Sequence, residues 1–438
     1  MKYALINATT YDFSNFYEQQ YIIFEETVLE IGKMEDFENH HYEIIDCQNH
    51  LVLPSLVVGH THIYSTFARG LSVNFDPHNF LELLEQLWWK IDRNLDNEMN
   101  YYSAIVSAVD YMKNGVTTMI DHHASGEIKG SLETLQKALS EKAGLRGIYC
   151  FETSDRFNVD ECINENIDFY HQFNSPMAKG LFGLHASLSL SEDTLIKVKA
   201  VIGNAPIHIH VAESEMDQED CQTRYHERVI ERLDRHGLLQ ENSILSHCIY
   251  VSDHELDIIK ERGCVIALNI SSNLNNAVGL PNYHKMKAKG IPVIIGNDGI
   301  SSSITTEYLS LYYAMHLQEK SPIGFSLVDL QNIINDTYQY VNKVMNIKIG
   351  KIQKGYQSDL LMLPYIAPTP LNEDNILGHL FFGCFNSFKP NHVFCNGKHV
   401  VNNYQVNKDL QNEYEKAQLI AKKCWENIQK ENDNELKN

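Results

Sequence analysis

Eight short apolar segments alternate with helical patterns between about Pro54 and Asn346, and this alternation restricts the fold more than any other feature. The segments are LPSLVVGH, GVTTMIDHH, GLRGIYCFET, AKGLFGLHAS, APIHIHVAE, NSILSHC, GCVIALNIS and GIPVIIGND. Several of them begin just after a glycine, a residue that commonly ends helices. Strands that alternate with helices indicate βα units and a parallel sheet. Eight such units predict an α/β fold of the (β/α)8 barrel type, which typically takes about 250 residues.

The two ends of the chain have a different pattern. Residues 1–53 and 347–407 contain short β-branched and aromatic runs separated by turn residues, as antiparallel strands do. Because these segments flank the barrel segment 54–346, we expect them to meet in one small composite β-sandwich domain. Residues 408–438 are polar and helix-prone, so we expect a charged C-terminal helix or tail there.

The composition narrows the classes of partner. The formal net charge is -21, and nucleic acids and anionic membrane surfaces attract basic proteins, so small molecules are the expected partners. The nine cysteines are scattered without a CxxC spacing, which predicts neither a disulfide framework nor a zinc finger. No apolar leader or membrane-length segment is visible, and we expect a cytoplasmic protein. The sequence leaves open whether the chain forms a homodimer.

The first apolar segment ends in GHTH, with His60 and His62 one residue apart. Alternation along a strand places both imidazoles on one face, about 6 to 7 Å apart along the chain. The two side chains could grip one cation, or they could be ordinary polar residues at a strand end. The pair alone does not decide between these two interpretations.

Further histidine and aspartate residues follow other predicted strands. His210 ends the fifth segment, His247 the sixth and Asp298 the eighth. Barrel enzymes collect their chemistry at the carboxyl ends of strands, so these side chains are expected to converge with His60 and His62. Imidazole and carboxylate ligands suit Zn(II) or Fe(II), and such a metal lowers the pKa of bound water to about 7.

Glu213 stands three residues after His210, just beyond the strand end. Its carboxylate could take a proton from water and pass it to a leaving nitrogen. The alternative is a surface carboxylate at the start of the next helix, which the neighbouring His210 makes less attractive.

Other polar residues near strand ends allow two interpretations each. His122 and His123 point to opposite faces, and we favour His123 as the one that faces the barrel mouth. His185 contacts substrate or is structural. His208 lies one layer deeper than His210, where a packed, hydrogen-bonded histidine is expected.

Arg69 and Cys248 also allow two interpretations each. Arg69 could clamp a substrate carbonyl or carboxylate with its planar guanidinium, or form a salt bridge at the barrel rim. Cys248 is expected to be a small buried residue, because hydrolysis by metal-activated water needs no thiol. The longest connection, residues 63–114, holds the pair Trp88 and Trp89. It is either an active-site cover or a set of ordinary extra helices.

The motifs GHTHIYS, IHIHVAES, LSHC and GNDG, in this order and spacing, resemble the amidohydrolase superfamily, in particular its metal-dependent deaminase and chlorohydrolase branch. The resemblance covers nearly the whole chain, including IGKIQKGYQSDLLML, which is similar to the family's return into its β domain. Within the branch, LWWKIDRNLDNE, TTMIDHHASGEIKGSLETL, CFETSDR and NAVGLPN look most like the SsnA group of aminohydrolases.

This resemblance implies roles for individual residues. It implies metal ligation by His60, His62, His210 and Asp298, proton transfer by Glu213 and Asp298, and a hydrogen bond from His247 to the attacking water or substrate. Binuclear relatives carry a carboxylated lysine at the end of the fourth strand, where this chain has His185, so one metal is expected, with zinc ahead of iron. The usual HCPxSN-like segment reads ALNISSNLNN here, and only Ser272 and Asn273 keep its end.

The function expected from the resemblance is hydrolytic deamination of a nitrogen heterocycle, purine-like or related. Ring opening of a cyclic amide and dechlorination use the same site and remain as alternatives. A catalytically inactive barrel that serves as a scaffold is the alternative outside enzymes, although such a chain would be expected to have lost ligands or the proton shuttle.

Overall fold

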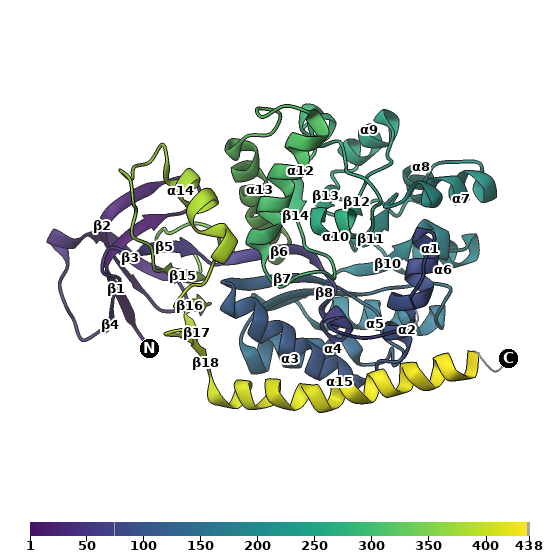
Figure 1. Cartoon of the computed structure of the whole chain (residues 1–438), viewed down its shortest axis with the longest axis horizontal. Helices are drawn as coiled ribbons and strands as arrows, with labels where there is room; N and C mark the ends of the chain where they lie inside the picture. Colours follow the sequence, from purple (N-terminus) through teal and green to yellow (C-terminus); the bar gives the residue numbers. More distant parts are fainter. Residues whose placement is uncertain (74, 436–438) are drawn as a thin grey trace.

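The computed structural model describes residues 1–73 and 75–435 of the chain. A barrel surrounded by helices occupies one side of the molecule, a β domain the other, and a long C-terminal helix runs beneath the barrel (Figure 1).

Parallel strands form the wall of the barrel. Within the described residues these strands are β6 Leu56–Thr61, β7 Val116–His123, β8 Arg146–Phe151, β9 Ala178–Gly180, β10 Phe182–Ala186, β11 Ile207–Val211, β12 Ile244–His247, β13 Val265–Leu268 and β14 Val293–Ile295. The strands β9 and β10 are two pieces of the fourth predicted segment. Parallel bridges from Thr153 to Leu184 and from Thr61 to Asp298 join the two halves of the ring. The predicted (β/α)8 barrel is therefore confirmed.

Helices cover the outside of this ring (Figure 1). The longer ones that follow or flank the barrel strands are α3 Asn97–Lys113, α4 Ser131–Gln136, α5 Val159–Gln172, α6 Glu192–Val201, α7 Glu215–Tyr225, α8 Val229–Arg235, α9 Asp253–Glu261, α10 Ile270–Asn275, α11 Tyr283–Ala288, α12 Ile304–Glu319 and α13 Leu327–Met345. Many begin at a side-chain cap: the Ser326 hydroxyl accepts from the Asp329 amide, and the Asp329 carboxylate accepts from the Ser326 amide. In the described part of the chain, no helix combines the length and apolar character needed to cross a membrane.

Strands from both ends of the chain share one sheet in the β domain. They are β1 Tyr3–Tyr11, β2 Phe16–Phe24, β3 Val28–Lys33, β4 Glu43–Asp46 and β5 Leu51–Pro54 from the N-terminal side, and β15 Leu360–Leu363, β16 His392–Cys395, β17 Lys398–Asn402 and β18 Gln405–Val406 from the C-terminal side. Strand β5 pairs antiparallel with β15. The rings of Phe24 on β2 and Phe394 on β16 lie 5.0 Å apart although other strands separate them in the sheet. The sheet is thus folded over its own core, as in a sandwich.

A buried ion pair ties the β domain to the barrel. Arg146 on β8 is fully buried, and its guanidinium donates to both oxygens of Asp359 next to β15. The same guanidinium donates to the Pro176 carbonyl at 2.7 Å and to the Thr118 hydroxyl at 3.2 Å. Because four of its five N–H groups have an acceptor, the guanidinium is held firmly, and the pair helps to fix how the two parts of the molecule meet.

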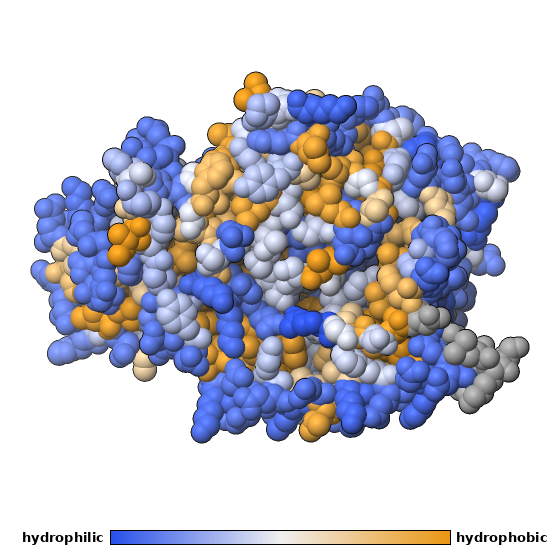
Figure 2. Space-filling model, viewed as in Figure 1, coloured by the Kyte–Doolittle hydropathy of each residue, from blue (hydrophilic) through white to orange (hydrophobic). Residues whose placement is uncertain are grey.

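The C-terminal residues form α15 Lys408–Glu435, preceded in the chain by the short α14 Ile376–Gly383. Helix α15 buries Ile420, Cys424 and Ile428 against the barrel side, while Figure 2 shows a mostly hydrophilic outer surface along its length. The indole of Trp425 donates to the Phe67 carbonyl at 2.7 Å. The helix therefore supports the connection that follows β6. All nine cysteines are buried free thiols.

Candidate active site

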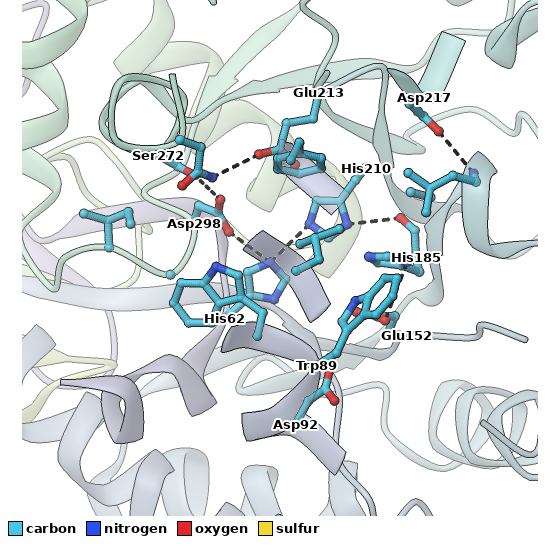
Figure 3. Close-up of a pocket in the computed structure, with 18 of the residues that line it drawn as sticks. His62, Trp89, Asp92, Glu152, His185, His210, Glu213, Asp217, Ser272 and Asp298 are labelled. Carbon is cyan, nitrogen blue, oxygen red and sulfur yellow. Dashed lines mark hydrogen bonds and ion pairs between the residues drawn. The ribbon is translucent and has the colours of Figure 1, made fainter. Parts of the chain in front are cut away.

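The predicted metal ligands and proton-transfer residues meet at the carboxyl ends of the barrel strands, where Figure 3 shows His62, His210, Glu213 and Asp298. His60 and His62 come from the end of β6, His210 from β11, His247 from β12 and Asp298 from the segment after β14. The residues that the chain spreads over more than 200 positions thus line one centre, as parallel strands in a closed barrel require.

Four of these side chains form a group suited to a metal ion. His60, His62, His210 and Asp298 each offer one ligand atom, and these atoms all lie within 4.8 Å of one another. Nε2 of His62 is 3.1 Å from Nε2 of His210 and 3.0 Å from an Asp298 oxygen. Nitrogen and carboxylate donors at this spacing match the ligands that zinc takes in proteins.

The outer nitrogen of each histidine is already engaged. Nδ1 of His60 lies 2.8 Å from Nε2 of His208, Nδ1 of His62 lies 2.6 Å from the His122 carbonyl, and Nδ1 of His210 lies 3.1 Å from the His185 carbonyl. Such contacts orient metal-binding imidazoles and fix their tautomer. All three Nε2 atoms therefore face the centre, and that of His60 is buried without a hydrogen-bond partner among the described residues. This arrangement fits a metal ion.

Electrostatics in the group favour a cation. Burial lowers the pKa of His60 to about 4 and holds that of His210 well below its ordinary value, so both rings are neutral, as ligands must be. Burial also opposes charge on His62, but the Asp298 carboxylate outweighs it and raises the pKa of His62 to about 9. A metal ion at this centre would replace that proton.

Glu213 and His247 lie beside the metal group. Nε2 of His247 is 3.5 Å from a Glu213 oxygen and 3.9 Å from an Asp298 oxygen. The Asn276 amide donates to the other Glu213 oxygen at 3.3 Å. Burial raises the pKa of Glu213, which helps a carboxylate to hold and release a proton near neutral pH.

Two residues of the site have an unusual backbone conformation. His247 has a φ of 72° and Asp298 a φ of 53°, a left-handed conformation that residues other than glycine seldom adopt. Both side chains are held in place by the segment after β13. Asn273 Oδ1 lies 2.8 Å from Nδ1 of His247, and the Ser272 hydroxyl donates to Asp298 at 2.5 Å. Ser272 and Asn273, the residues that keep the end of the family segment, thus orient two residues of the site.

A cavity opens above these groups. Its far wall is built by aromatic and apolar side chains of the connection between β6 and α3, namely Phe80, Leu84, Trp88 and Trp89. These residues come from α1 Phe80–Leu83, the helical turn that follows it, and α2 Trp89–Arg93. Of the two interpretations of this connection, the active-site cover is the one that the structure supports.

The weaker predictions from the sequence have mixed outcomes. His185 lines the cavity, with Nδ1 2.6 Å from the Ser189 hydroxyl, so its contact with substrate stays a prediction. Arg69 lies outside the described cavity lining: its side chain is 58% exposed and its guanidinium donates to Asp110 at 2.9 Å. The salt bridge at the rim is therefore the correct interpretation, and the substrate clamp is wrong.

The preference for His123 over His122 is also wrong. The His122 ring lies 4.6 Å from the His210 ring inside the barrel, whereas His123 packs outward, with Nε2 3.1 Å from the Ser125 hydroxyl. The expected packing of His208 and the burial of Cys248 are confirmed.

The cavity also contains residues that were not predicted from the sequence. Glu152 follows β8, Asp92 lies on α2, and both line the cavity together with Asp217. Arg156 pairs with Glu152 and Asp92. Glu152 could have been predicted, because it is a carboxylate near the end of the third predicted strand, as Asp298 is at the end of the eighth. Asp92 and Arg156 carry no such local signal.

Comparisons with known proteins define the class. Residues 51–400 match the model of the Amidohydrolase family, so the chain belongs to this family. A 5'-deoxyadenosine deaminase from Methanocaldococcus jannaschii is 26% identical over 417 residues, which cover 93% of this chain and 96% of that protein. A 5-methylthioadenosine/S-adenosylhomocysteine deaminase from Pyrococcus furiosus is 28% identical over 345 residues, which cover 76% and 80%.

Solved structures share the fold. A zinc-bound adenosine deaminase from Xanthomonas campestris superposes with a TM-score of 0.82 at 17% identity, covering 96% of this chain and 98% of that one. An atrazine chlorohydrolase from Arthrobacter aurescens complexed with zinc gives 0.79 at 16% identity, covering 96% and 100%. The family predicted from the sequence motifs is confirmed, and the closer likeness to the SsnA group stays a prediction.

Proposed function

We propose that this protein is a zinc-dependent aminohydrolase that hydrolyses the exocyclic amino group of a neutral, purine-like heterocycle and releases ammonia. The observation that carries the proposal is the four-residue ligand group with Glu213 and His247 directly beside it. The relatives that match most of the chain are deaminases of adenosine analogues, which supports this substrate class.

In this proposal His60, His62, His210 and Asp298 hold one zinc ion. When bound, the metal lowers the pKa of water and thereby supplies a nucleophile at neutral pH. Each ligand is oriented by a second contact, so the group is rigid before substrate arrives. The fourth strand carries His185 where a second metal would need a carboxylated lysine, and Lys179 donates instead to Asn174 at 2.7 Å. One metal is therefore proposed.

The proton transfers belong to Glu213, His247 and Asp298. Addition of water to the ring carbon and loss of ammonia move two protons: both leave the water, one reaches a ring nitrogen, and the other reaches the amino group, which departs as ammonia. Glu213 lines the cavity beside the metal group, and in this proposal it carries protons from the water to these nitrogens. His247, held at Nδ1 by Asn273, hydrogen-bonds the attacking water or the substrate through Nε2, and His185 contacts the ring.

The cavity selects for neutral substrates in this proposal. Its aromatic cover suits a flat ring, which stacks on indole and phenyl faces. Among the described residues that line it, acidic side chains occur and no lysine or arginine does. A phosphate or carboxylate on the substrate would find no cationic partner there.

The test is an ammonia assay on zinc-loaded protein. The panel contains adenosine, 5'-deoxyadenosine, 5'-methylthioadenosine, adenine, guanine, cytosine and adenosine 5'-monophosphate, with the product identified by mass spectrometry. We expect ammonia from the neutral purines and little turnover of the monophosphate. The His210→Ala protein is the matched control for contaminating deaminases. A ring-opened product without ammonia, or no turnover of any compound by zinc-loaded protein, would contradict the proposal.

A further inference from the structure

A buried ionic cluster lies in the wall of the cavity away from Ser272 and Glu213 (Figure 3). The Arg156 guanidinium donates to Asp92 at 2.9 Å and to Oε1 of Glu152 at 2.5 Å. It also lies 4.6 Å from the centre of the Trp89 ring, which connects the cluster to the aromatic cover. Asp92 and Glu152 line the cavity, so the carboxylates of the cluster face the space that a substrate would fill.

Among the described residues, one oxygen of the Glu152 carboxylate accepts a hydrogen bond and the other accepts none. Oε1 receives the hydrogen bond from Arg156 and lies 3.9 Å from Nδ1 of His185, whereas Oε2 accepts no hydrogen bond from any described residue. The Glu152 side chain is only 4% exposed. Because Glu152 lines the cavity and Oε2 lacks a donor from the protein, this oxygen is available to accept a hydrogen bond from a ligand in the cavity.

Asp217 shows that a carboxylate oxygen without a hydrogen-bond donor is not a general property of the cavity. Asp217 also lines the cavity, but one of its oxygens accepts from the Leu188 amide at 3.1 Å and the other from the Ala212 amide at 2.9 Å. Its carboxylate is thus used in holding two loops. Glu152 differs because its second oxygen is left to the cavity.

Glu152 is charged when it faces the cavity. Burial acts to raise its pKa, but His185 and Arg156 outweigh burial and lower the pKa to about 2. The indole N–H of Trp89, whose ring lines the same cavity, is buried without an acceptor among the described residues. An acceptor and a donor on the cavity wall thus lack partners inside the protein.

We infer that Glu152 is a specificity-determining residue, which accepts a hydrogen bond from an N–H or O–H group of the substrate on the side remote from Glu213. This inference rests on the proposed function, because it concerns the same cavity. A site built to accept from a substrate donor discriminates strongly against a ligand that lacks the donor, since the carboxylate then stays unpaired. The donor is either a sugar hydroxyl or an amino or ring N–H group, which are alike in this chemistry.

The experiment compares Glu152→Gln with the wild type on two pairs of compounds. Adenosine and 2',3'-dideoxyadenosine differ in the sugar hydroxyls, and 2,6-diaminopurine and adenine differ in a second amino group. We expect kcat/KM of the wild type to favour the donor-bearing member of one pair by roughly 10- to 100-fold, as hydrogen bonds to charged groups do. In Glu152→Gln this preference should fall at least fivefold. The pair that responds identifies the source of the donor.

The control is Asp217→Asn, which changes a cavity carboxyl group whose oxygens accept hydrogen bonds from the backbone. We expect it to change kcat/KM of both members of a pair by a common factor. If the two preferences of Glu152→Gln stay within twofold of the wild type, the inference is overturned. Zinc content and melting temperature of both variants are measured first. If Glu152→Gln does not fold, Glu152→Asp takes its place, because it keeps the charge for Arg156 and shortens the reach into the cavity.

Failure of the proposed function has a separate signature. If the wild type releases ammonia from none of the four compounds, deamination is refuted, and calorimetric binding of the same compounds to wild type and variant then decides the role of Glu152. A loss of at least fivefold in the affinity ratio supports the inference. An unchanged ratio, or no binding of any compound, overturns it.

Discussion

Replacing Glu213 by glutamine is expected to abolish most of the turnover while leaving the metal in place. Glutamine has the shape of glutamate, and its carbonyl can still accept the 3.3 Å hydrogen bond from Asn276. It cannot take up and release a proton near neutral pH. Glu213 does not belong to the group His60, His62, His210 and Asp298, so the metal keeps all four of its proposed ligands.

The size of the effect follows from the role. Proton transfer by a positioned side chain contributes about 10²- to 10⁴-fold to a rate, which corresponds to about 3 to 5 kcal/mol in the activation free energy. Stability should change little, because among the described residues this carboxylate makes one 3.3 Å hydrogen bond and one 3.5 Å contact with His247. A change of about 1 kcal/mol or less in the free energy of unfolding is expected.

The assay combines steady-state ammonia release, metal analysis by mass spectrometry and urea denaturation. The expected result for Glu213→Gln is a kcat reduced at least 100-fold, one zinc per chain and an unchanged denaturation midpoint. Asn276→Ala is the control, because it removes the hydrogen bond to Glu213, together with those to Ser272 and from Asn275, but keeps the carboxylate, and it should reduce kcat far less. A kcat of Glu213→Gln within threefold of the wild type would refute the proton-transfer role. A loss of zinc would mean that Glu213 is itself a ligand.

Three further predictions concern the metal, the domain junction and a buried acid. His210→Ala should lose zinc and activity together in metal analysis and the ammonia assay, because it removes a ligand; retention of one zinc per chain would contradict the assignment. Arg146→Met should lower the free energy of unfolding in urea by about 3 to 5 kcal/mol, since it leaves Asp359 buried without its cation, and a loss below 1 kcal/mol would disprove the pair's importance. Glu307 is buried and has a pKa raised by burial from 4.5 to about 7, so the folded state keeps its proton where the unfolded chain has lost it, and stability falls as the pH rises from about 4.5 to 7. The loss over the whole range approaches about 3 kcal/mol, of which about 2 kcal/mol falls between pH 5 and 7.5. Glu307→Gln, which imitates the protonated acid, should therefore gain about 2 kcal/mol over the wild type between these pH values in urea denaturation; an equal difference at both pH values would contradict it.

The fold could be predicted from the sequence because its signals are local. Each barrel strand is a short apolar run, and each run is followed by a helical pattern, so strand number and order can be read along the chain. The split of the fourth strand at Leu181 could not be predicted, because it depends on how β9 pairs with β8 and β10 with β11.

The metal group could be predicted for a related reason. His60, His62, His210 and Asp298 each follow a strand, and a closed parallel barrel brings all such positions to one end, whatever lies between them in the chain. The role of Arg69 as a substrate clamp was predicted wrongly because its partner, Asp110, lies 41 positions away on α3. Nothing near Arg69 in the sequence shows that its charge is already paired.

Taken by itself, the sequence determined the barrel, the family and the residues at the strand ends, since hydrophobic periodicity and motif spacing are properties of neighbouring residues. Only the tertiary structure decided that His122, and not His123, points into the barrel, because the closed ring of strands fixes the direction of each side chain. It also decided that Glu152 keeps one oxygen free while both oxygens of Asp217 are occupied. Hydrogen-bond partners from distant segments set that difference, and only the folded chain brings those segments together.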